Sequence, residues 1–227
     1  MIEILYTIFI YPIELLIKLI LESAYQLTGS YGLSIVAVSI VISVLLYPID
    51  CLIERLQEKE RLKREAMKPQ LEDLKQSFNG YELHLYVKQV YREHNYHPLS
   101  ELKSSLGLLI QLPFLFAAYL FIANYEPLQG VSFSLISDLS EPDSLIQVAS
   151  FSINFLPIMM TAVNIAGTYF YTKTSKIKLS LQLYTMSIVF LVLLYPAPSG
   201  LLIYWTCKNV FSFLKYLILY LRSLQTQ

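Results

Sequence analysis

The chain has little cysteine, little histidine and no net charge. Its 227 residues include two cysteines and three histidines, and its 17 basic residues balance 17 acidic ones. Cys51 and Cys207 lie in or beside apolar stretches, so we expect free thiols and no disulfide framework. His94 and His97 are spaced like a metal pair, but no cysteine or further histidine lies beside them, and we predict no metal site.

The sequence also lacks the motifs of common catalytic sites. It has no glycine-rich phosphate loop, no nucleophile elbow, and no His or Asp pair within an apolar stretch that would suit hydrolysis. We therefore expect no enzyme activity, no catalytic residue and no cofactor.

Apolar residues are abundant instead. Hydrophobic residues make up 55% of the chain, the mean hydropathy is +0.51, and the charges are clustered. This composition is typical of a polytopic membrane protein. The stretch from Gly29 to Ile49 carries no charged residue, and at about 1.5 Å per residue it matches the roughly 30 Å hydrocarbon core of a bilayer.

Three further uncharged stretches follow, and the last is divided by Pro196 to Gly200. A proline-rich break inside a long apolar run predicts a turn between two helices. The sequence therefore predicts an all-α membrane protein with five transmembrane helices, at residues 31–49, 106–125, 149–171, 179–195 and 200–221.

The first 26 residues combine apolar positions with a narrow polar stripe. Seven polar residues recur every three or four positions: Glu3, Thr7, Tyr11, Glu14, Lys18, Glu22 and Tyr25. This spacing predicts an amphipathic helix over 1–26 that lies in the membrane interface. A full span is disfavoured because glutamates facing lipid are costly, and a signal peptide because no basic residue precedes the apolar run.

Residues 50–105 form the one long polar segment, with ten basic and ten acidic residues. Asn79-Gly80 is a turn signal between two stretches of helical periodicity, so we predict a helical hairpin that Pro98 ends. Because its charges balance, the hairpin offers no basic patch for nucleic acid, and a solvated hairpin near lipid headgroups is one interpretation of it.

Charge bias orients the predicted spans. The loop 126–148 carries four acidic residues and no basic one, whereas basic residues near the other span ends share the side of 50–105; these are Lys173, Lys176, Lys178 and Arg222. The positive-inside rule places the hairpin and the C-terminus in the cytoplasm. The N-terminal helix and the loop 126–148 are then outside.

Short motifs follow one another along nearly the whole chain: Tyr31-Gly32-Leu33-Ser34-Ile35, Lys68-Pro69-Gln70-Leu71, His97-Pro98-Leu99, Gln111-Leu112-Pro113-Phe114, Leu156-Pro157-Ile158 and Pro198-Ser199-Gly200-Leu201. In this order and topology the chain resembles the YidC/Oxa-type membrane protein insertases. The resemblance implies one insertase domain over 1–227 in a bacterial cytoplasmic membrane.

The resemblance also implies a mechanism. Five spans would enclose a hydrated groove that is open to the cytoplasm and to lipid. The groove would take hydrophilic parts of nascent membrane proteins partway across, while apolar parts move into lipid. Such a groove would shorten the apolar path that a polar segment must cross, and it would need no bound nucleotide. The implied partners are nascent membrane proteins, the bilayer, and a Sec translocon or another membrane complex.

One position departs from the family pattern. Members commonly carry an arginine five residues before the proline that ends the first span, and that position is Ser43 here. Ser39, Ser43 and Asp50 share a helix face, with Asp50 at the cytoplasmic mouth. Helix packing or hydrogen bonding to the preceding turn is the competing explanation for the serines. The change suggests a specialised paralogue.

Lys208 is a second polar feature. It lies about 12 Å inside the fifth span, where a lysine costs about 2.5 to 3.5 kcal/mol on insertion scales. We hypothesise that it supplies the groove's positive charge, with Ser43, Gln111, Thr206 and Asn209 as neighbours. Snorkelling or burial against a hydroxyl is the alternative. Asn164 and Thr168 complete the candidate groove residues, although hydrogen bonding between helices is an equally simple role for them.

Two rival functions remain open. The chain could be a non-inserting structural or assembly partner of a membrane enzyme complex. A small-solute or lipid transporter would instead show inverted repeats and paired charges near the midplane, which the sequence lacks apart from Lys208. The C-terminus has no long basic tail, so direct ribosome binding is not expected.

Overall fold

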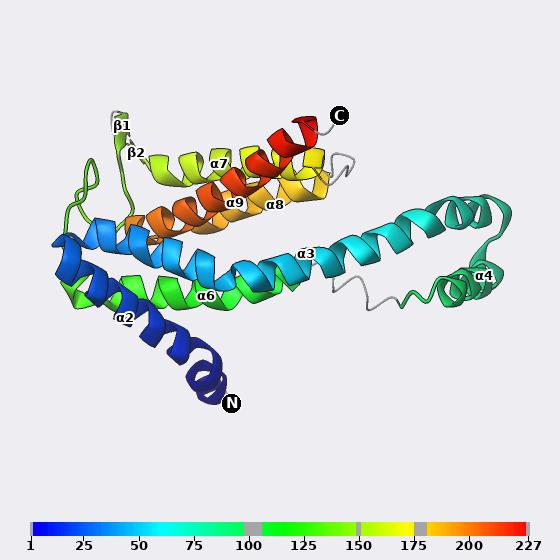
Figure 1. Cartoon of the computed structure of the whole chain (residues 1–227), viewed down its shortest axis with the longest axis horizontal. Helices are drawn as coiled ribbons and strands as arrows, with labels where there is room; N and C mark the ends of the chain where they lie inside the picture. Colours follow the sequence, from blue (N-terminus) through cyan, green and yellow to red (C-terminus); the bar gives the residue numbers. More distant parts are fainter. Residues whose placement is uncertain (1, 98–105, 149–150, 175–180, 226–227) are drawn as a thin grey trace. The chain divides into compact units, whose positions relative to one another are not determined.

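The computed structural model describes residues 2–97, 106–148, 151–174 and 181–225 (Figure 1). The chain divides into two compact units, which we call unit 1 (Met1–Leu45 with Pro113–Gln227) and unit 2 (Leu46–Leu112). Helices α3 (Tyr31–Ser77) and α6 (Leu106–Asn124) contribute residues to both units.

The protein is mostly helical, as predicted. The remaining helices are α1 (Ile2–Leu5), η1 (Tyr6–Ile10), α2 (Tyr11–Thr28), α4 (Gly80–Glu93), η2 (Glu126–Leu128), α7 (Phe155–Thr174), α8 (Leu181–Leu194) and α9 (Ser199–Gln225). The all-α prediction missed one short ribbon of two antiparallel strands, β1 (Ile146–Val148) and β2 (Phe151–Ile153).

The N-terminal amphipathic segment is helical but not uniform. η1 is a π-helical turn, and α2 follows it with Pro12 in its first turn and Gly29 in the left-handed conformation (φ 64°) at its end. Ile17 and Leu21 are buried, whereas Leu15 and Leu19 are more than half exposed. α2 therefore presents apolar side chains both to the protein and away from it.

The helix that follows is continuous where the prediction divided it. α3 runs from Tyr31 to Ser77 through Pro48, so the uncharged residues 31–49 and the charged residues after them form one helix. Among the described residues, α3 is the one helix both long and apolar enough to cross a membrane. Ile110–Asn124 and Tyr184–Leu194 are shorter apolar helices.

The loop before α7 corrects the start of the third predicted span. Residues 149 and 150 lie outside the described residues, and 151–153 are strand, so α7 begins at Phe155 rather than at 149. The Asp143 carboxylate accepts hydrogen bonds from the amides of Phe155 (2.6 Å) and Leu156 (3.2 Å). A carboxylate at this position satisfies free N–H groups and favours a helix start there.

The same loop binds the start of α9. The amides of Ser199 and Gly200 donate to the carbonyls of Glu141 and Leu139, each at 2.8 Å. A Cβ on Gly200 would lie 3.0 Å from the Leu139 carbonyl oxygen and 3.1 Å from the Ile35 side chain. Glycine is thus needed where the loop, α3 and α9 meet.

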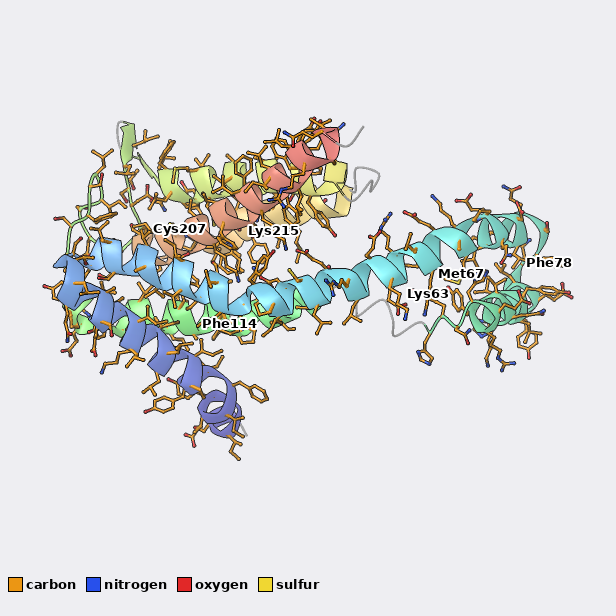
Figure 2. The ribbon with its side chains drawn as sticks, viewed as in Figure 1. Lys63, Met67, Phe78, Phe114, Cys207 and Lys215 are labelled. Atoms are coloured by element: carbon orange, nitrogen blue, oxygen red, sulfur yellow. The ribbon has the colours of Figure 1, made fainter. Side chains whose placement is uncertain are left out.

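Unit 2 contains the two helices predicted as a hairpin. α3 ends at Ser77, and α4 begins at Gly80, whose φ is 61°. Met67, which points toward α4 in Figure 2, forms a buried cluster with Val90 and Tyr96. Pro98 itself lies outside the described residues.

Polar contacts flank this apolar cluster. The Lys63 ammonium donates to the Asn95 carbonyl at 3.1 Å, and the His94 ring lies 3.2 Å from the Gln70 side-chain oxygen. These contacts join α3 to the residues that end α4.

Candidate functional site

The candidate site lies where the first part of α3 meets α9 in unit 1. The Ser39 hydroxyl donates a hydrogen bond of 2.8 Å to the Tyr204 carbonyl, and both residues are buried. Figure 1 shows the two helices running in the same direction. A serine hydroxyl that bonds to a carbonyl of a neighbouring helix fixes their separation and register.

This register brings Ser43 of α3 and Lys208 of α9 to the same height along the two helices. Ile35 meets Gly200 and Ser39 meets Tyr204, so contacting residues differ by 165 positions at two successive turns. One turn further along, the same separation pairs Ser43 with Lys208. Their exposed fractions are 3% and 4%.

Lys208 lies over an aromatic ring of its own helix, and that ring packs against a second aromatic ring of α8. Its ammonium lies 5.5 Å from the centroid of the Trp205 ring, and that ring lies 5.9 Å from the Phe190 ring of α8. A cation over a desolvated indole face is stabilised by about 2 kcal/mol or more. This partly offsets the cost of keeping a lysine away from water.

Several buried polar atoms at this level have no hydrogen-bond partner within the described residues. They are the Ser43 hydroxyl, the Tyr204 hydroxyl, the Trp205 ring N–H, the Thr206 hydroxyl and the Asn209 side-chain amide nitrogen. Since most buried polar groups in proteins are hydrogen-bonded, such a concentration is unusual. These atoms are candidate partners for further polar groups.

The structure places Asn164 and Thr168 differently. Both lie on α7, and the Asn164 side-chain oxygen accepts bonds from the Thr168 hydroxyl (3.5 Å) and from the Ser187 hydroxyl of α8 (3.3 Å). They therefore form a hydrogen-bonded contact between α7 and α8. Their place in a groove stays a prediction.

Asp50 and Gln111 belong to unit 2. Asp50 lies seven residues after Ser43 on α3, Gln111 lies on α6, and both are half-buried. The place of Asp50 at the cytoplasmic mouth and the proximity of Gln111 to Lys208 stay predictions.

From sequence, Tyr204 and Trp205 near the start of the fifth predicted span suggest interfacial anchors, which the structure does not support. Their exposed fractions are 1% and 3%, so they lie inside the bundle. The sequence did carry a signal for this, because a lysine follows three residues after the tryptophan, and a cation at that spacing can reach the indole face.

The described residues include no group of three or more His, Cys, Asp or Glu side chains arranged to hold a metal ion. Cys51 and Cys207 are both free thiols.

Comparison with known proteins identifies the family. The model of the family described as 60Kd inner membrane protein matches residues 23–225. The chain belongs to this family, the YidC/Oxa family.

Individual members of the YidC/Oxa family are similar over most of this chain. A "Membrane protein insertase YidC" of Treponema denticola is 31% identical over 93% of the chain, and one of Treponema pallidum is 29% identical over 92%. The chain spans 38% and 35% of the length of these two relatives.

A solved structure shares the fold. It is titled "Active YidC insertase crystal structure with the first transmembrane domain resolved", and the match has a TM-score of 0.57 at 21% identity. The match covers 93% of this chain and 46% of that one.

Proposed function

We propose that this chain is a membrane protein insertase domain whose polar site is built on Ser39, Ser43 and Lys208. The observation that carries the proposal is a buried lysine of α9 at the level of a buried serine of α3. A membrane protein keeps an ionisable side chain in its bundle at considerable cost, which favours a functional role.

The proposed mechanism is thermodynamic. A hydrophilic segment of a nascent membrane protein enters beside α3 and α9, where Lys208 attracts its acidic groups and the unpaired hydroxyls offer hydrogen bonds. Each such contact replaces one made with water. The barrier to bringing the segment partway across the membrane is thereby lowered, and no bond is made or broken.

Loop packing supports closure of one end of this site. Phe133 of the loop lies so close to Gly32, at the start of α3, that a Cβ on Gly32 would overlap the Phe133 ring. Leu139 and Glu141 bond to the first residues of α9. We propose that this end faces outward and that the site opens toward the cytoplasm.

The positions of the other helices in the membrane are proposed from their order along the chain and from the charge bias of the loops. Helices α3, α6, α7, α8 and α9 are the five spans, with α2 in the outer interface and the C-terminus in the cytoplasm. The α3 and α4 hairpin is proposed to lie in the cytoplasm and to receive clients or to contact a Sec translocon or another membrane complex.

The test is insertion of a reporter with an acidic translocated segment into liposomes that contain only this protein. Lys208→Met should slow insertion by about tenfold, since a charge-assisted hydrogen bond contributes about 1.5 to 3 kcal/mol. Lys208→Arg should retain most activity. Lys215→Met is the matched control, because Lys215 lies on the same helix and its ammonium is 5.3 Å from the Tyr216 ring.

Loss of folding would not explain the expected result. Replacing a buried cation with an apolar side chain of similar length should leave the bundle at least as stable. Equal insertion by wild type and Lys208→Met would refute the role of the charge. If the wild-type protein alone inserted no reporter, the role of a non-inserting assembly partner would replace this proposal.

A further inference from the structure

A second polar site lies between the N-terminal helices and the end of α6. It is a pocket of about 480 Å³, within the size range of small-ligand sites. Its lining combines one acidic, one basic, one amide and four large apolar or aromatic side chains: Glu14, Lys18, Asn124, Tyr6, Leu120, Phe121 and Tyr125. All seven belong to unit 1.

The two charged groups are held one helical turn apart on α2. The Tyr6 hydroxyl donates a 2.6 Å hydrogen bond to the Glu14 carboxylate, which raises the pKa of the tyrosine. Lys18 is half exposed and forms an ion pair with Glu22, with its ammonium 3.8 Å from the Glu22 carboxylate. An ion pair between exposed side chains is weak, so the ammonium can exchange Glu22 for an anionic ligand group.

Aromatic rings line the far side of the pocket. Phe121 stacks on Tyr125 with a centroid distance of 4.8 Å, and the Tyr125 hydroxyl donates to Glu22 at 3.2 Å. Aromatic faces favour organic cations such as an ammonium group. The Glu14 carboxylate and the aromatic rings can thus bind a cationic group of a ligand, and the Lys18 ammonium can bind an anionic group.

We propose that this pocket binds the headgroup of a zwitterionic phospholipid that carries a primary amine. The phosphate lies at Lys18, and the ammonium lies at Glu14 beside the aromatic rings. An anionic headgroup without an amine would leave Glu14 without a counter-ion and is bound less well.

The surroundings favour a lipid over a soluble phosphate compound. Ile8, Phe9, Leu15 and Leu19 are all more than half exposed on the same helices. Exposed apolar side chains in such numbers are stable against acyl chains rather than water. A lipid bound at the pocket would bring its acyl chains to this surface.

The test compares lipids retained by the purified full chain. Protein is equilibrated with vesicles of phosphatidylethanolamine and phosphatidylglycerol in equal amounts, and retained lipids are quantified by native mass spectrometry. Glu14→Gln should reduce the preference for phosphatidylethanolamine by about threefold. Lys18→Gln should lower retention of both lipids while leaving the preference in place.

Matched controls are available in the same unit. Glu3→Gln removes an exposed carboxylate from the N-terminal helices, and Lys173→Gln removes an exposed lysine that also lies over a tyrosine ring, at 5.5 Å. Neither residue lines the pocket, so both variants should match wild type. Leu120→Trp fills the pocket without altering its charges and should reduce retention of phosphatidylethanolamine.

Two outcomes overturn the proposal. One is an unchanged lipid preference in Glu14→Gln together with unchanged retention in Leu120→Trp. The other is displacement of the lipid by soluble phosphoethanolamine at equal concentration, which would assign the pocket to a soluble phosphate compound. Both measurements are independent of insertion activity.

Discussion

The two parts of α3 handle polar groups in opposite ways. In unit 2, Arg61 pairs with Glu58 and with Glu65 on the same helix, one turn away on either side. In unit 1, Ser39 bonds to another helix, and Ser43 has no hydrogen-bond partner within the described residues. A helix that satisfies its own charges can remain in water. One that does not must obtain its partners from neighbouring helices or from bound molecules.

The largest expected effect comes from the apolar core of unit 2. Met67→Ala should destabilise the α3 and α4 pair by about 2 to 5 kcal/mol, because Met67 is 1% exposed and a cavity would remain. Hydrogen exchange of the α4 amides measures this. Leu62→Ala on the same helix is the control, since Leu62 is 54% exposed. Equal exchange in the two variants would contradict the assigned packing.

The next effect concerns the contact that positions the candidate site. Gly200→Ala should destabilise unit 1 by about 1 to 3 kcal/mol, because the new methyl would press on a backbone oxygen at 3.0 Å. Thermal unfolding in detergent measures it. Gly107→Ala is the control, since its nearest neighbour would be 3.5 Å away and alanine favours a helix. A Gly200→Ala variant as stable as Gly107→Ala would argue against the close approach of α3 and α9.

A smaller effect is expected from the hydrogen bond between α3 and α9. Ser39→Ala should cost about 1 kcal/mol, a typical value for a single neutral bond. Ser34→Ala is the matched control: Ser34 is also buried on α3, but its hydroxyl donates to the carbonyl of Ser30, the residue just before α3, at 2.8 Å. A thermal shift larger for Ser34→Ala than for Ser39→Ala would contradict the register given above.

The smallest effect belongs to the ion pairs of unit 2. Arg61→Gln should cost under about 0.5 kcal/mol, because its partners are largely exposed. The hydrogen bond from Arg61 lowers the pKa of Glu58, so the pair stabilises the helix above the ordinary glutamate pKa. That contribution is lost as the pH falls through the lowered pKa. When hairpin helicity is measured as the pH is lowered, wild type and Arg61→Gln should therefore reach the same helicity at low pH.

Much of the fold could be predicted from sequence because hydrophobic runs and proline breaks are local signals. The break at Pro196 to Gly200 separates α8 from α9 as expected, and Asn79-Gly80 lies at the turn between α3 and α4. The predicted start of α7 was wrong because the observed start is set by Asp143, which lies 12 residues before Phe155. The Asp143 carboxylate accepts hydrogen bonds from the first amides of the helix.

The candidate site was only partly predictable. Lys208 stands out in sequence as a charge in an apolar run, but nothing local pairs it with Ser43; that pairing depends on the register of α3 against α9. Tyr204 and Trp205 were misassigned because aromatic residues at a span end suit both an interface and a buried core. Only the packing of α8 against α9 distinguishes the two.

The separation of 165 positions between Ser39 and Tyr204 also has a consequence for biosynthesis. A ribosome adds about 5 to 20 residues per second, so Ser39 is made on the order of ten seconds before its partner. During that interval the Ser39 hydroxyl lacks its partner on α9 and must bond to another group. The proposed first span thus presents, during its own synthesis, the same problem that the protein is proposed to solve for its clients.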